Sequence, residues 1–468
     1  MIALEVGETV QVNATVVPED EHAVLLWSSA DEKVATVSDG RVHGIGKGLT
    51  TIAASCRKAS RKIVAAVTDD KGKDDGKADE DDPRWQPKGC ILFDCRFSRG
   101  EKDDAVNRNN IASYSPDGLM VRADGSLVRL DKFYALAQRS VRYQIVPKDG
   151  TVAVFQSNSG DFVVTLDVPN KRMSVATSPE TVRKVGFLEG GKDFIVEIGH
   201  DYQTSTVKVD DPSTGDSVEI ILTNDGSGGV GRGALQAGFS VGMQYDYYCF
   251  GLKEGDSYVV KRMTVSTPRD KVKLMIYGDS ITQPEGYFPT GDFPGAWTQR
   301  IISRLGGDAV SSGRGGGVIG WVQDYIRNEL PYIKAEYVMV TIGTNGGNTE
   351  ENLSDLVKYI QSMGAIPILN NIPSNESGTQ IGVNETIAKV REKLEIKGVK
   401  FDLATSIDGD GKVVDKSMMF WEDYAPESVF HGWQVYHHPN GKGGKAMFER
   451  ALADVPEVFG PRELCVPK

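Results

Sequence analysis

The chain has 468 residues, 40% of them apolar and 25% charged, and a net charge of -12 at neutral pH. This length exceeds what one hydrophobic core usually supports, so we expect two to four domains of ordinary globular composition. Because no run is dense in Lys and Arg, a nucleic-acid partner is disfavoured, and no apolar run is long enough to span a bilayer.

Residues 1–68 alternate apolar and polar positions in short runs separated by Gly, Pro and Asp, which predicts a β-sandwich. We expect Trp27 to be its core aromatic residue. Its runs Leu4–Val12, Val34–Val37 and Gly40–Gly48 resemble the group 2 bacterial immunoglobulin-like domain. The resemblance implies an Ig-like sandwich that acts as a spacer or adhesive module on an exported bacterial protein.

The first residues have no basic region followed by an apolar stretch, so we expect them not to be a signal peptide. The strand pattern begins within a few residues of Met1, which favours an export signal that has been trimmed over a cytoplasmic protein. We therefore expect a secreted, periplasmic or cell-surface location. The five cysteines show no metal-ligand spacing, and Cys90 and Cys95 are compatible with either a disulfide or reduced thiols.

Residues 69–88 are dominated by Asp and Lys and contain little that can be buried, which predicts an acidic flexible linker. A calcium-binding loop is the alternative, although the Asp spacing fits no EF-hand. Residues 89–270 return to many short alternating runs, which predicts a second antiparallel sandwich of jelly-roll or lectin-like type. Its aromatic cluster Tyr245–Phe250 is either packed between sheets or a sugar-stacking platform.

Residues 271–468 combine short buried strands with amphipathic helices, which predicts a parallel sheet covered by helices. The expected strands are 273–277, 309–310, 337–342, 366–369 and 399–403, and the expected helices include 297–305, 353–360 and 387–394. In such sheets ligands bind at the carboxyl ends of the strands.

Three segments with polar or glycine residues come directly after predicted strands, so we expect them at the carboxyl edge of the sheet. Ser280 comes directly after the first strand, a glycine-rich loop with Gly315 and Gly316 follows the second, and Asn345 follows the third. His438 precedes the last helix. A serine near a histidine is the minimum for nucleophilic catalysis, whereas the simpler reading of Ser280 and Asn345 is helix capping.

These segments, in this order, resemble the four blocks of the SGNH (GDSL-type) hydrolase family across residues 271–468. The resemblance implies a three-layer, flavodoxin-like α/β domain. It also implies that Ser280 is the nucleophile and His438 the base, and that the amides of Ser280, Gly316 and Asn345 form the oxyanion hole, with Gly315 an alternative to Gly316. No metal or cofactor is implied.

One position departs from the family pattern. The family usually has Asp three residues before the histidine, but this chain has Val435 there. If His437 were the base instead, the position would be Gln434. A Ser–His dyad, a substitute acid or lost activity would each be consistent with this departure, and the candidates for a substitute acid are Glu422, Asp423 and Glu427.

The sequence therefore predicts a multidomain carboxylic ester hydrolase, with domains at 1–68, 89–270 and 271–468. Two sandwiches ahead of the catalytic region favour a small-molecule or polysaccharide ester, with deacetylation of a carbohydrate the preferred reaction. The alternative is a cell-surface carbohydrate-binding or adhesive protein with a degenerate hydrolase domain. The sequence makes no prediction of oligomeric state.

Overall fold

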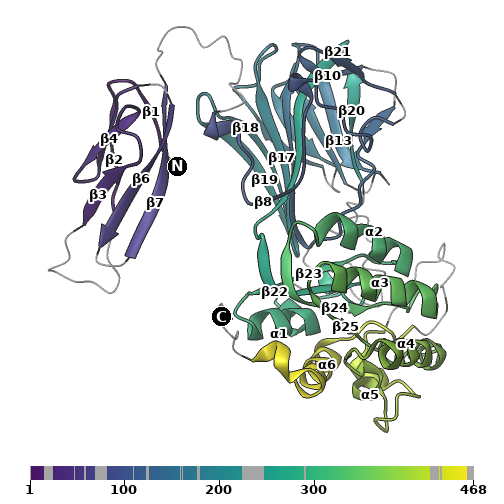
Figure 1. Ribbon diagram of the computed structural model, residues 1–468. Coiled ribbons are helices and arrows are strands. Elements are labelled where there is room, and N and C mark those ends of the chain that lie inside the picture. Colours follow the sequence, from purple (N-terminus) through teal and green to yellow (C-terminus); the bar gives the residue numbers. More distant parts are fainter. Residues whose placement is uncertain are drawn as a thin grey trace. The chain divides into compact units, whose positions relative to one another are not determined.

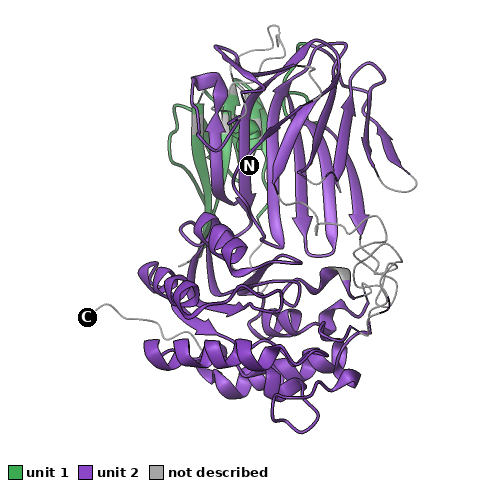
Figure 2. Ribbon diagram, turned by 90° about the vertical axis from the view of Figure 1, so that its right-hand side faces the viewer, with its two compact units in different colours: residues 1–86, 191–193, 211–216 green, residues 87–190, 194–210, 217–468 purple. Residues whose placement is uncertain are grey.

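The computed structural model describes most of the chain (Figure 1). The described residues are 2–14, 25–46, 48–56, 59–68, 82–108, 110–122, 126–158, 160, 162–176, 180–223, 247–288, 291–421, 432 and 435–460. They form two compact units: residues 1–86 with 191–193 and 211–216, and residues 87–190 with 194–210 and 217–468 (Figure 2).

The N-terminal region is a small sandwich of two sheets with its own core. One sheet has the order β1 (Ile2–Glu5), β7 (Ala59–Thr68), β6 (Gly48–Cys56), β3 (Leu26–Ser29), and the other has the order β2 (Thr9–Gln11), β5 (Arg41–Gly44), β4 (Ala35–Ser38). Val42 and Ile52 are fully buried between the sheets. Trp27 is only half-buried and packs at the margin of this core rather than at its centre.

The expected linker is folded at its described end, while residues 69–81 lie outside the described part of the chain. The short 3₁₀ helix η1 (Pro83–Trp85) is capped by the Asp82 carboxylate, which accepts the Arg84 N–H at 2.9 Å. Trp85 is 3% exposed. A buried tryptophan fixes this stretch, so the described residues 82–86 are folded, although the linker was predicted to reach residue 88.

The middle region is a larger sandwich of two sheets. The first has the order β19 (Asp216–Thr223), β18 (Thr204–Asp211), β17 (Phe194–Asp201), β12 (Gln138–Val146), β21 (Ser257–Thr267), β10 (Gly118–Arg122), β9 (Ser113–Ser115), with β8 (Cys90–Arg96) also paired to β21. The second has the order β11 (Leu127–Arg129), β20 (Tyr248–Glu254), β13 (Val152–Ser157), β14 (Val163–Asp167), β15 (Arg172–Val175), β16 (Thr181–Lys184).

In the aromatic cluster of this sandwich, Tyr248 and Phe250 are buried between the sheets, as the packing alternative predicts; Tyr245 and Asp246 lie outside the described residues. Cys90 and Cys95 are both free thiols. They occupy one extended strand five positions apart, which is too far for a disulfide.

The C-terminal region contains a four-stranded parallel sheet. Its order is β23 (Ala309–Gly313), β22 (Lys271–Gly278), β24 (Lys334–Thr341), β25 (Ile366–Leu369). Leu274 and Ile276 of β22 face one core, while Met275 and Tyr277 face the other, because side chains alternate along a strand.

Helices pack on both faces of this sheet (Figure 1). One face packs with α2 (Ile319–Glu329), α3 (Glu350–Ser362) and α4 (Gln380–Leu394). The other face packs with α1 (Trp297–Arg304), α5 (Phe401–Thr405) and α6 (Gly441–Asp454). The expected strand at 399–403 is wrong: Lys397 makes an isolated bridge to Ile368 and Val399 accepts the Asn371 N–H, but Phe401 begins α5 and enters the core.

The middle sandwich and the parallel sheet share one hydrophobic core. Residues just before β12 pair with the edge strand β23: Leu136 bridges Ser312, and the Ala137 N–H donates to the Ser311 carbonyl at 3.0 Å. The fully buried Glu329 of α2 accepts the backbone N–H groups of Ala135 at 2.7 Å and Leu136 at 3.2 Å. The expected boundary at residue 270 thus lies inside one compact unit.

Candidate active site

Ser280 sits in a tight turn at the carboxyl end of β22, as the sequence pattern predicts. Gly278 is required before it, because a Cβ there would lie 2.4 Å from the Thr341 carbonyl oxygen and 2.2 Å from the Thr282 hydroxyl. The turn is closed by the Asp279 carbonyl, which accepts the N–H groups of Thr282 at 3.0 Å and Gln283 at 3.1 Å. Asp279 also accepts the Ile281 N–H through its side chain at 3.0 Å, which further fixes the turn that contains Ser280.

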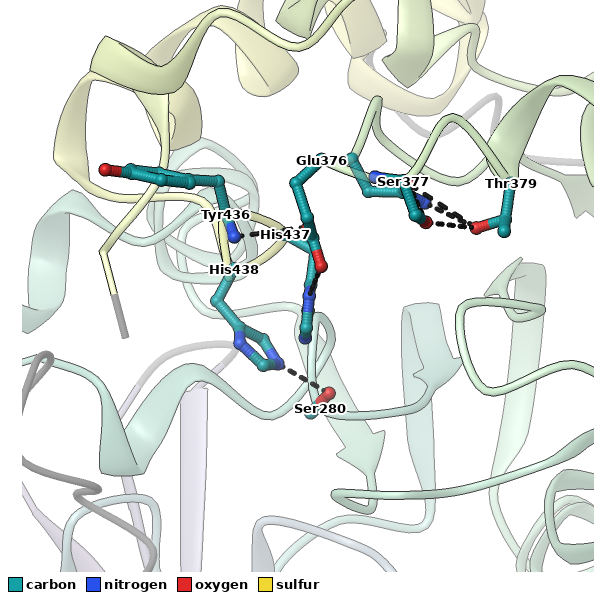
Figure 3. A network of polar contacts seen from close by, with 8 residues as sticks. Ser280, Glu376, Ser377, Thr379, Tyr436, His437 and His438 are labelled. Carbon is teal, nitrogen blue, oxygen red and sulfur yellow. Dashed lines mark hydrogen bonds and ion pairs between the residues drawn. The ribbon is translucent and has the colours of Figure 1, made fainter. Parts of the chain in front are cut away.

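His438 reaches this serine from the segment before α6. Its Nε2 lies 2.8 Å from the Ser280 hydroxyl, and the two side chains come from positions 158 residues apart (Figure 3). The ring of Tyr287 stacks on the imidazole with centroids 4.0 Å apart and planes at 25°. Ser280, His438 and Tyr287 are 5%, 4% and 3% exposed, so the hydroxyl–imidazole contact is largely shielded from solvent.

The backbone on the C-terminal side of His438 is held by its neighbours. Its carbonyl accepts the Phe420 N–H at 2.8 Å, and Pro439 bridges Met419. Asn440 then caps α6 through the N–H groups of Lys442 at 2.9 Å and Gly443 at 3.2 Å. The histidine therefore projects from a segment with defined geometry, which a base needs in order to meet a hydroxyl.

The loop after β23 brings the predicted glycines to the same edge. Gly316 is exposed and has a φ of +73°, a backbone conformation that glycine adopts without strain. The neighbouring Gly315 N–H already donates to the Gln283 side-chain oxygen at 2.7 Å, which ties this loop to the nucleophile turn. A Cβ on Gly316 would meet no atom within 4 Å, so the backbone conformation, not crowding, accounts for glycine there.

Asn345 lies in the loop after β24, and its side-chain amide donates to the Gly317 carbonyl at 2.9 Å. The helix-capping role is filled instead by Thr349, whose side chain accepts the Asn352 N–H at 3.1 Å in a capping box. Since a side-chain amide carries two N–H groups, Asn345 can offer the second to a ligand.

The structure pairs the second histidine with a carboxylate that the sequence reasoning missed. His437 Nδ1 lies 3.4 Å from the Glu376 carboxylate, and the rings of His437 and His438 are 4.2 Å apart (Figure 3). Glu376 lies in the loop after β25. The same argument that placed Asn345 at the carboxyl edge of the sheet, namely its position after a parallel strand, also applies to Glu376. The expected acids Glu422, Asp423 and Glu427 lie outside the described residues, and Val435 is buried at 2% exposure.

Burial and charge alter the ionisation of the carboxylates around this edge. Burial raises the pKa of Asp279 to about 6, against the opposing effects of the Ile281 N–H and the His437 charge. For Glu376, burial would raise the pKa, but its hydrogen bond and charge interaction with His437 outweigh burial and the pKa lies below the ordinary value. Glu376 is therefore a carboxylate at neutral pH.

No described helix is long and apolar enough to cross a membrane. Over the same residues, no cluster of three or more His, Cys, Asp or Glu side chains is arranged to hold a metal ion.

Residues 2–67 match the family model of the bacterial Ig-like domain (group 2), which confirms the resemblance seen in the sequence. A lacto-N-biosidase from Bifidobacterium bifidum is 34% identical over 71 residues, which is 15% of this chain and 6% of that protein. This chain thus spans only a small part of the length of that curated relative.

Several solved structures are similar to parts of this chain. A GDSL-like lipase from Bacteroides thetaiotaomicron is 13% identical and covers 41% of this chain and 87% of its own, with a TM-score of 0.30. A variant of an acetyl-xylooligosaccharide esterase from Geobacillus is 15% identical, with coverages of 42% and 97% and a TM-score of 0.31. The lectin-like arcelin-5 from Phaseolus vulgaris is 12% identical, with coverages of 33% and 89% and a TM-score of 0.25. With TM-scores of this size, these likenesses do not bear on the chemistry of the site.

Proposed function

We propose that this protein is a metal-independent carboxylic ester hydrolase in which Ser280 is the nucleophile and His438 the general base. The observation that carries the proposal is the 2.8 Å contact between the Ser280 hydroxyl and His438 Nε2 at the carboxyl edge of a parallel sheet. A serine is a weak nucleophile until a base takes its proton, and this distance is within the range that such a transfer needs.

In the acylation step, Ser280 Oγ attacks the ester carbonyl while His438 Nε2 accepts the hydroxyl proton. This role requires the His438 tautomer that carries its proton on Nδ1. The imidazolium then returns the proton to the departing alcohol, which leaves an acyl-Ser280. A water molecule activated by the same imidazole hydrolyses the acyl-enzyme and releases the carboxylic acid.

The tetrahedral oxyanion would be stabilised by the backbone amides of Ser280 and Gly316 and by the Asn345 side chain. The Gly315 amide is already used by Gln283, which favours Gly316 as the glycine donor. In other acyl-transfer enzymes a single such donor contributes about 2.7–4 kcal/mol to lowering the barrier. We assign residues 271–468 to a three-layer SGNH-type hydrolase domain on this set of residues.

For the substrate, we propose a small acyl group, preferably an acetyl ester on a carbohydrate. The 5% exposure of Ser280 and the stacking of Tyr287 on His438 support a narrow site that suits a short acyl chain. The bacterial Ig-like domain supports a secreted, periplasmic or cell-surface location, where polysaccharide esters occur.

The competing function is a carbohydrate-binding or adhesive surface protein whose hydrolase domain has lost activity. The observation that favours it is the buried Val435 in place of a carboxylate. Hydrolysis of p-nitrophenyl acetate by the purified full chain separates the two candidates. We expect Ser280→Ala and His438→Ala each to lower kcat/KM by about a thousandfold or more, and His437→Ala to leave most of it.

Ser377→Ala, which alters a hydroxyl in the nearby loop after β25, is the matched control and should hydrolyse the ester like the unaltered chain. If the unaltered chain and Ser280→Ala hydrolyse the ester at the same rate, the hydrolase proposal is wrong.

A further inference from the structure

Glu376 lies in a loop that brings it to the same sheet edge as the proposed catalytic residues. This loop, residues 370–379, follows β25, and parallel strands end at a common edge. The loop is anchored from below: the Asn371 side chain donates to the Asp402 carboxylate at 2.8 Å, and the Ser374 N–H donates to the Thr405 hydroxyl at 2.9 Å. These hydrogen bonds fix the position of the loop that carries Glu376.

The Glu376 carboxylate holds the histidine segment through both of its oxygens. Oε2 accepts the Tyr436 backbone N–H at 3.2 Å, and Oε1 contacts His437 Nδ1 at 3.4 Å (Figure 3). The Glu376 and His437 side chains are 24% and 22% exposed, so solvent screens this contact only in part. An ionised carboxylate can only accept, so His437 Nδ1 carries a proton in this contact.

These two contacts occur on the side of His438 that lacks the family's acid. The backbone after His438 is fixed by residues 418–420, through the Phe420 N–H and the Met419–Pro439 bridge. The two residues before His438 are the ones that Glu376 holds. The histidine segment is therefore secured from both ends, by two different parts of the chain.

We propose that Glu376 is a positioning residue that compensates for the missing acid at position 435. It acts through Tyr436 and His437 by fixing the backbone that carries His438, so that Nε2 stays within reach of the Ser280 hydroxyl. His437 is part of this support and not the base, because the serine hydroxyl contacts His438. This inference rests on the proposed hydrolase function.

The test compares Glu376→Ala and Glu376→Gln in the full chain with p-nitrophenyl acetate. Displacing a catalytic group by about 1 Å can cost about a hundredfold in rate, so we expect Glu376→Ala to lower kcat by about 10- to 100-fold with KM nearly unchanged. Glutamine keeps one accepting oxygen for the segment, so Glu376→Gln should recover most of the lost kcat. If Glu376→Gln is as slow as Glu376→Ala, or if kcat is unchanged in Glu376→Ala, Glu376 is not a positioning residue for His438.

Two further measurements keep the inference separate from the hydrolase proposal. Glu350→Ala removes an exposed carboxylate that contacts Lys389 at 3.5 Å, and it should change neither kcat nor the unfolding temperature. In a crystal structure of Glu376→Ala, we expect the 2.8 Å separation between Ser280 Oγ and His438 Nε2 to lengthen beyond hydrogen-bond range. If the separation stays the same, Glu376 does not position His438, even when the chain proves to be an esterase. The same distance tests the role of Glu376 when hydrolysis is absent.

Discussion

The two β-rich regions of this protein have similar sequence patterns but different structural roles. The Ig-like region closes a small core of its own, which contains Val42 and Ile52. The middle sandwich shares its core with the parallel sheet, so that Phe133 packs edge-on against Tyr325 of α2 with centroids 5.5 Å apart. Alternating strands alone thus do not distinguish a separable module from a region on which the catalytic fold depends.

The difference lies in the buried polar contacts between the sandwich and the sheet. A buried carboxylate or amide is tolerated only when its partners are in place. Glu329 Oε1 accepts a backbone N–H group and the Gln203 amide donates to a backbone carbonyl across the junction between the sandwich and the catalytic region. The junction is therefore specified by hydrogen bonds as well as by apolar packing.

The largest expected effect comes from separating the regions. We expect residues 271–468 expressed alone to show no cooperative unfolding and no ester hydrolysis, because one side of their core and the Glu329 partners would be missing. A chain that starts at Asp82 should keep both properties, since the Ig-like core is separate. Circular dichroism melting and hydrolysis rates measure both, and a folded, active 271–468 fragment would show that the catalytic region does not depend on the middle sandwich.

A point change at the junction should have the next largest effect. Glu329→Ala leaves the N–H groups of Ala135 and Leu136 buried without their acceptor, and each loss costs about 1–3 kcal/mol, so we expect the free energy of unfolding to fall by about 4 kcal/mol. Glu329→Gln keeps an accepting oxygen and should lose much less. Urea unfolding measures both, and equal losses in the two variants would contradict the hydrogen-bond explanation.

The same carboxylate should make stability depend on pH. Burial raises the pKa of Glu329 to about 7, above the ordinary value of 4.5. The folded state therefore binds the proton more tightly than the unfolded state, so this stabilisation is complete below the ordinary value and is lost as pH rises through about 7. The expected loss is about 3 kcal/mol. Urea midpoints from pH 4.5 to 8 measure it, and the dependence should be shallower in Glu329→Gln than in the unaltered chain.

The sequence predicted what depends on local patterns. The sequence predicted that Ser280, Gly316 and Asn345 lie at the carboxyl edge of the sheet. Each of them follows a buried strand, and parallel strands end at one edge. The pairing of Ser280 with His438 followed only from the family resemblance and not from strand spacing, since the contact joins positions 158 residues apart. Residues 399–403 were misread as a strand because a short apolar run does not distinguish a strand from a buried helical turn.

The partners of the site were predictable only in part. Glu376 had a usable signal in its place after β25, but the family pattern puts the acid close to His438 in the sequence. Tyr287 and Gln203 had none, because a stacking ring and a buried amide follow from tertiary packing and not from spacing. The role of Glu329 was equally hidden, since one carboxylate on a helix is usually exposed to solvent.

The smallest expected effect tests whether the sandwich also supports the site. Gln203, which is 5% exposed, donates from its amide to the carbonyls of Glu285 at 2.9 Å and Phe288 at 2.6 Å. These carbonyls flank Tyr287, whose ring stacks on His438. Gln203→Met removes the donor at similar volume, and we expect kcat/KM for p-nitrophenyl acetate to fall by about tenfold, which corresponds to about 1.4 kcal/mol.

Gln156→Met, in β13 of the other sheet, is the matched control, because its amide donates to the adjacent Ser157 carbonyl at 3.4 Å and not to the residues around Tyr287. If Gln203→Met lowers the unfolding temperature but leaves kcat/KM equal to that of the control, the sandwich stabilises the fold without positioning the histidine. A loss of kcat/KM with little change in unfolding temperature would instead show that the middle region, unlike the Ig-like region, contributes to the geometry of catalysis.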